Sequence, residues 1–105
     1  MVLDPGGVNG RADHTVATGA AVEAATRAGI SVLAWGLPPD VASVLNEETG
    51  STAFSPVGPG SFTVPVDRER QRLATLTYAH DAAADTLGWR RLELLGDTER
   101  LRWLR

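Results

Sequence analysis

Asp13 and His14 are neighbours whose side chains could take part in chemistry, and they end the glycine-rich stretch GGVNGRADHT. A carboxylate beside an imidazole suits acid–base catalysis, and imidazole is a common metal ligand. The alanine-rich segment that follows lacks proline, so we expect a helix with Asp13 as its N-cap and Gly29 at its end. The competing interpretation, favoured on this pair alone, is a capping Asp13 followed by a surface His14.

The elements around this pair alternate between strand and helix. MVLD predicts a short strand, and residues 30–36 predict a second strand after the helix. Because SVLAW is apolar nearly throughout, that strand suits a parallel sheet covered on both faces. We therefore predict a single α/β domain over residues 1–105, a partial Rossmann-like three-layer parallel sheet with flanking helices. The Asp-His loop follows the carboxyl end of a strand, where such sheets bind ligands.

Further along the chain, proline and glycine mark the predicted boundaries. PPDVASVLNEETG predicts a short helix that Gly50 ends, and STAFSPVGPG predicts a loop. SFTVPV predicts a short strand that Pro65 restricts to a sheet edge, because proline has no N–H to donate. The closing TERLRWLR predicts a terminal helix capped by Asp97.

His80 lies in the segment DRERQRLATLTYAHDAAADTLG, which predicts a long helix capped by Asp67. Leu73, Leu76 and His80 follow one another at helical spacing and form one stripe. We therefore expect His80 to face the core.

Composition excludes several classes of function. The chain has 105 residues, 43% of them hydrophobic, and a formal net charge of −3, which argues against nucleic-acid binding. Without cysteine there is no disulfide, thiolate metal site or cysteine nucleophile. We see no apolar run long enough for a membrane span and no signal-peptide pattern, and we expect a cytoplasmic protein.

The stretch DPGGVNGRADHTVATGAAVEAA resembles the second signature of the LmbE/PIG-L family of metal-dependent N-acetyl-sugar de-N-acetylases, in which a Gly-His-Pro-Asp-His run opens a helix after a strand. The segments VLAWGLPPDVASVLNEETG, VPVD, AH and LLGDTERLRWLR follow in the family's order, so the resemblance covers nearly the whole chain. It implies a zinc-dependent hydrolase that removes acetyl groups from N-acetylglucosamine-type sugar conjugates.

The resemblance assigns roles to individual residues. His14 matches a metal ligand of the family, and Asp13 matches the acid before it. Arg11 stands where relatives carry a histidine that stabilises the oxyanion and can protonate the leaving amine, and Ala12 replaces a proline. A guanidinium can stabilise negative charge but cannot give up a proton near neutral pH. His80 matches a family histidine, although Asp81 follows it where Ser-Gln is expected.

The family's first signature, an Ala-His-Pro-Asp-Asp run, has no counterpart in this chain. In relatives that run supplies the other two metal ligands and the general base, and catalytic zinc typically needs three protein ligands. We therefore expect the chain to resemble the C-terminal part of such an enzyme, to bind zinc weakly by itself and to be inactive alone, either through truncation or through loss of catalysis.

Two hypotheses of different classes stay open. One is a partial hydrolase that needs the missing signature from another chain. The other is a non-catalytic α/β interaction or oligomerisation module. We also expect a homo-oligomer, because a sheet that lacks strands leaves an edge open to pairing. Nucleotide binding through GGVNG is disfavoured, since neither a G-x-G-x-x-G run nor a Walker lysine is present.

Overall fold

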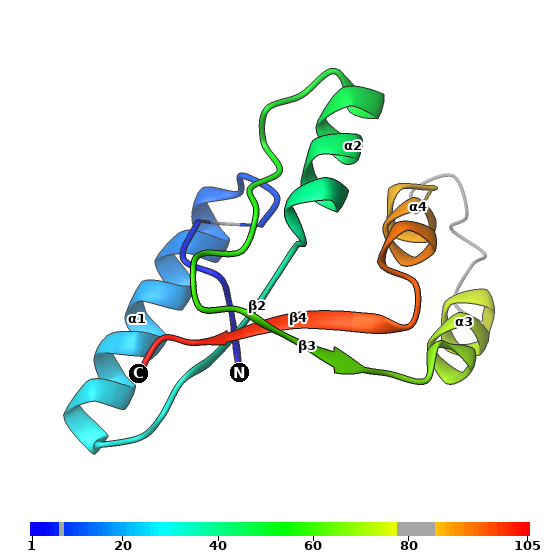
Figure 1. Cartoon of the computed structure of the whole chain (residues 1–105). Helices are drawn as coiled ribbons and strands as arrows, with labels where there is room; N and C mark the ends of the chain where they lie inside the picture. Colours follow the sequence, from blue (N-terminus) through cyan, green and yellow to red (C-terminus); the bar gives the residue numbers. More distant parts are fainter. Residues whose placement is uncertain (7, 78–85) are drawn as a thin grey trace.

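A computed structural model describes residues 1–6, 8–77 and 86–105 of the chain. The elements follow in the order β1 (Val2–Leu3), α1 (Ala12–Ala28), β2 (Leu33–Gly36), α2 (Pro39–Thr49), β3 (Phe62–Pro65), α3 (Arg68–Thr77), α4 (Thr86–Leu95) and β4 (Thr98–Trp103). The fold is mixed α/β, with helices flanking a sheet (Figure 1). The α/β class predicted from the sequence is therefore confirmed.

The described part of the chain forms one four-stranded sheet in the order β1-β2-β4-β3. β1 pairs with β2 in parallel, whereas β4 is antiparallel to both of its neighbours. The prediction of a parallel sheet is correct for the first pair and wrong for the rest. The reason is that TERLRWLR forms strand β4 and not the predicted terminal helix.

The register of β4 explains why this segment is a strand. Arg100 and Arg102 alternate with Leu101 and Trp103, so the apolar side chains share one face of the strand. Along the middle of the sheet, Trp103, Arg102 and Leu101 pair with successive residues of β2. A period of two therefore outweighs the weak helical spacing of the two leucines.

Helix α1 ends at the residue that the sequence predicts but begins at a different residue from the predicted one. Gly29 ends it in the left-handed conformation (φ 68°), with its N–H directed at the carbonyls of Ala25 and Thr26. The N-cap is Arg11 and no side chain caps the helix, so the prediction of an Asp13 cap is wrong. Asp13 is the second helical residue, and its carboxylate is bound by the Arg11 guanidinium.

The hydrophobic core lies away from α1, around helix α2. Its buried members are Val8, Leu37, Val41, Ala42, Leu45 and Leu95. α2 begins with proline in its first turn and ends at Gly50 as predicted, which places Val41 and Leu45 one turn apart on the buried side. All residues of α1 lie within the described ranges, and Thr18 is the one that is buried.

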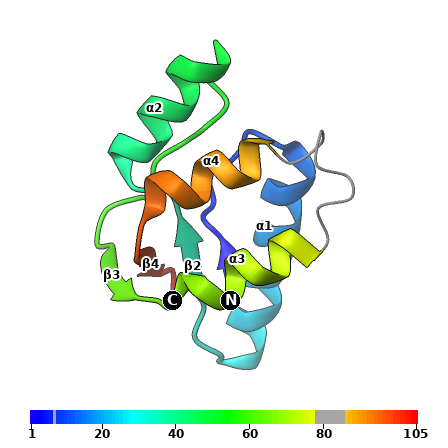
Figure 2. The same cartoon turned by 90° about the vertical axis from the view of Figure 1, so that its right-hand side faces the viewer.

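Helices α3 and α4 lie at the same end of the sheet, where β4 begins (Figure 1 and Figure 2). The N–H of Glu69 donates to the Asp67 carboxylate (3.0 Å), which supports the predicted cap of α3. Of the long helix predicted from residue 67 onward, the structure describes α3, and α4 begins within the last residues of the predicted segment. Residues 78–85, and with them the orientation expected for His80, lie outside the described residues.

The edge strands are short. β3 carries Pro65 at its end and pairs with β4 on one side, as predicted for a proline-containing edge strand. β1 is the edge strand at the opposite end of the described sheet, and it pairs with β2.

Among the described residues, no helix has the length and apolarity needed to cross a membrane.

Candidate functional site

His14 lies in the first turn of α1, beside the carboxyl end of β1. It lines a pocket of about 310 Å³ together with Met1, Val2, Leu3, Ala17, Thr18 and Ala21. The Thr18 hydroxyl donates to the carbonyl of Leu3 (3.0 Å) and holds α1 against the strand. Apart from His14 and Thr18, the lining side chains are apolar.

The imidazole of His14 has one buried nitrogen in this pocket. Its Nδ1 atom is buried and has no hydrogen-bond partner among the residues that the structure describes. A buried polar atom without a partner is costly, so in folded proteins such an atom commonly meets a ligand, a water molecule or an ion. Among the described residues that line this pocket, His14 is therefore the best placed to bind a ligand.

Arg11 and Asp13 form an ion pair at the surface beside this pocket. The Arg11 Nη2 and Nε atoms donate to the two oxygens of Asp13 at 2.8 and 3.1 Å, and the two side chains are 63% and 60% exposed. The Arg11 hydrogen bond lowers the pKa of the Asp13 carboxyl, so this group is ionised at neutral pH. The structure thus joins Arg11 to Asp13 and places both next to His14, while His80 lies outside the described residues.

Zinc requires more donors than this region supplies. Catalytic zinc typically has three protein ligands. Within residues 1–6, 8–77 and 86–105, no group of three or more His, Cys, Asp and Glu side chains is placed to hold a metal ion. The chemistry of His14 Nδ1 suits a ligand, but the described residues do not fit a zinc ion by themselves.

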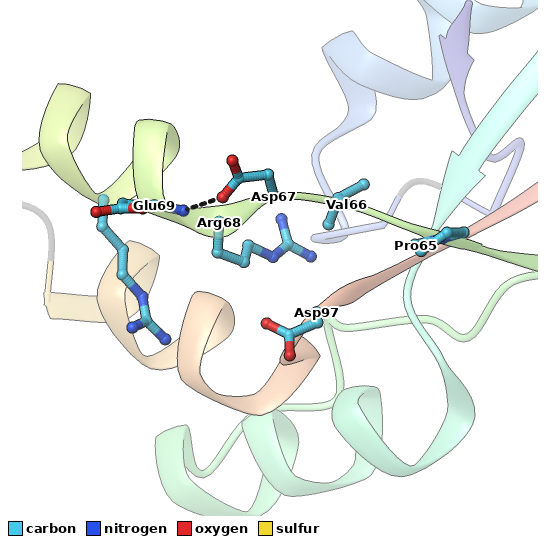
Figure 3. A pocket seen from close by; sticks show the side chains of 7 residues that line it. Pro65, Val66, Asp67, Arg68, Glu69 and Asp97 are labelled. Atoms are coloured by element: carbon cyan, nitrogen blue, oxygen red, sulfur yellow. Dashed lines mark hydrogen bonds between the residues drawn. The ribbon is translucent and has the colours of Figure 1, made fainter.

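Another depression, of about 600 Å³, lies between α3 and the start of β4 (Figure 3). It is lined by Pro65, Val66, Asp67, Arg68, Glu69, Arg72 and Asp97. Figure 3 shows the Arg68 guanidinium in the same region as the Asp67 and Asp97 side chains, and its positive charge disfavours a cation there.

Arg68 is buried, with 4% of its surface exposed, and the sequence analysis did not identify it. Its guanidinium donates to the carbonyls of Gly96 (2.6 Å) and Thr98 (2.8 Å) and to the Glu99 carboxylate (2.6 Å). Nothing in the polar run DRERQR distinguishes this arginine from its neighbours. Because its donors are already used within the chain, Arg68 supports the fold and not a reaction.

Comparisons of this chain with protein-family models, with curated proteins and with solved structures found no match. The LmbE/PIG-L resemblance therefore rests on the sequence motifs alone.

Proposed function

We propose that this chain is part of a LmbE/PIG-L-type N-deacetylase, acting on N-acetylglucosamine-type conjugates, that contributes one metal ligand and is inactive alone. The observation that carries the proposal is the buried His14 Nδ1 atom, which has no partner among the described residues and lies in a pocket against an edge strand. Such an atom is suited to a site that is completed by groups from elsewhere.

The geometry of β1 supports this assignment. The Asp4 N–H donates to the Trp35 carbonyl (2.8 Å), so the N–H and C=O of Leu3, one residue earlier, point away from β2. The Leu3 carbonyl accepts from Thr18, and β1 has β2 as its strand neighbour in the described sheet. A strand added at this edge would lie beside the His14 pocket, and to pair with the Leu3 carbonyl it would have to displace the Thr18 hydrogen bond. The proposal also implies a fold, in which the four-stranded sheet is part of a larger Rossmann-like three-layer sheet.

A reconstitution experiment tests this proposal. The chain is mixed with the N-terminal half of a complete LmbE/PIG-L deacetylase, and retained zinc and released acetate are measured with an N-acetylglucosamine conjugate. We expect the mixture to retain zinc and release acetate, and His14→Ala to abolish both. The chain alone should bind zinc weakly, with little change in His14→Ala.

The control is the C-terminal half of that same deacetylase. If the control restores activity and our chain neither pairs with the N-terminal half nor retains zinc, the proposal is wrong. Submicromolar, stoichiometric zinc binding by the chain alone that depends on His14 would also contradict it, because the site would then need no second half.

The second candidate is a non-catalytic interaction or oligomerisation module. It is favoured by the exposure of Met1 (84%) and Val16 (71%) and by the sparse burial of α1. A long helix with so little buried surface gains little stability from packing, and self-association would supply more.

A further inference from the structure

Arg91 and Arg100 are the two partly buried arginines among the described residues that form no ion pair with a described residue. Arg68 bonds Glu99, Arg90 bonds Glu48 and Glu93, and Arg102 bonds Asp4, so each has a carboxylate partner. Arg100 donates to the Ser61 hydroxyl (3.4 Å), and Arg91 is half-buried. The Nε atom of Arg91 is buried and has no hydrogen-bond partner among the described residues.

The surroundings of Arg91 hold its guanidinium in place without neutralising it. The Cζ atom lies 5.6 Å from the centroid of the Trp35 ring, which is a cation–π contact. Trp35 is itself fixed, because its indole N–H donates to the Glu99 carboxylate. Glu99 also accepts from Arg68 at 2.6 Å, so that carboxylate is already matched by one cation. The Arg91 guanidinium itself therefore has no carboxylate partner among the described residues.

We propose that Arg91, held over Trp35, binds a small oxyanion, either a carboxylate or a phosphate group of a ligand. Stacking uses the flat face of a guanidinium and leaves its N–H donors at the edge, where they match the two oxygens of a carboxylate or phosphate. The Nε–H is buried, so an oxygen reaches it only when neighbouring side chains move, and the contact would then remove the cost of the unpaired Nε.

The position in the sheet favours a ligand as well. Trp35 is the penultimate residue of β2. In open α/β sheets, ligands bind in the crevice outside the carboxyl ends of the strands, and Trp35 lies near that end of β2. The proposal goes beyond the deacetylase assignment, because the His14 pocket contains neither Arg91 nor Trp35.

NMR spectroscopy of the ¹⁵N-labelled chain tests this site. Sodium phosphate and sodium acetate are titrated separately, with sodium chloride at equal ionic strength as the reference. We expect saturable shifts of the Trp35 indole N–H and the Arg91 Nε–H signals, assigned from Trp35→Phe and Arg91→Lys. The indole of Trp103, which is 59% exposed, should not shift in this way. Comparing acetate with phosphate shows which oxyanion binds more tightly.

Arg90 provides the matched control, because it adjoins Arg91 on α4 and its guanidinium is occupied by Glu48 and Glu93. Arg91→Met should abolish the saturable shift, whereas Arg90→Met should keep it. If Arg91→Met does not fold, Arg91→Lys is used in its place. Lysine keeps the positive charge but lacks the planar pair of N–H donors, so we expect the oxyanion to bind about tenfold more weakly. Equal shifts with chloride, or unchanged affinity in the folded Arg91 variant, would overturn the proposal. His14→Ala should leave these shifts unchanged, which separates this test from that of the deacetylase assignment.

Discussion

At the scale of single residues, the buried Arg68 guanidinium ties the first turn of α3 to the start of β4. We expect Arg68→Met to reduce the free energy of unfolding by about 3–5 kcal/mol, because it leaves the Glu99 carboxylate partly buried without its cation. Urea denaturation followed by circular dichroism measures this. The control is Arg27→Ala, which removes an exposed pair with Glu23 and should cost at most about 1 kcal/mol. Equal losses in the two variants would show that Arg68 does not have the role assigned to it.

The Asp13 carboxyl gives a prediction about pH. Because the Arg11 guanidinium lowers its pKa in the folded chain, the ion pair stabilises the fold above the pKa of the unfolded state. This contribution is lost as the pH falls through the lowered pKa of the folded state. We expect the NMR titration of the Asp13 side chain to have its midpoint below the ordinary aspartate value, and Arg11→Ala to raise that midpoint. An unchanged midpoint in Arg11→Ala would mean that the pair does not form in solution.

At the scale of elements, two glycines of α1 should respond in opposite ways to the same substitution. Gly19 lies inside the helix, and a Cβ added there would meet no atom within 4 Å. Gly19→Ala should therefore stabilise the chain by about 0.5–1 kcal/mol. Gly29 has φ 68°, which strains any residue with a side chain, so Gly29→Ala should destabilise it by about 1 kcal/mol. Thermal unfolding of both variants checks the signs, and a stabilising Gly29→Ala would contradict the assigned end of α1.

At the scale of the whole molecule, the exposed apolar residues Met1 and Val16 predict self-association. We expect sedimentation velocity at high micromolar concentration to show a dimer or a larger assembly, and Val16→Asp to shift it toward monomer without loss of helix signal. Leu45→Asp should instead unfold the chain, because the Leu45 side chain is fully buried in the core. A cooperatively unfolding wild-type monomer at that concentration would rule out the predicted assembly.

The sequence by itself determined the boundaries that depend on neighbouring residues. Gly29 and Gly50 end their helices, Asp67 accepts an N–H at the start of α3, and Pro65 lies on an edge strand. These signals are reliable because capping and the missing N–H of proline act within a few residues. The parallel pairing of the first two strands followed for a similar reason, since one helix connects them.

The tertiary structure decided what depends on residues far apart in the chain. TERLRWLR could form either a helix or a strand, and pairing with β2 and β3 makes it a strand. Arg102 pairs with Asp4, and Arg68 and Trp35 meet at Glu99, although nothing near these residues in sequence marks them. Of the candidate site, the sequence identified His14. Only the fold showed that its Nδ1 atom is buried without a partner among the described residues, and that Arg91 stacks on Trp35. Long-range pairing and burial depend on the whole chain, so local patterns do not predict them.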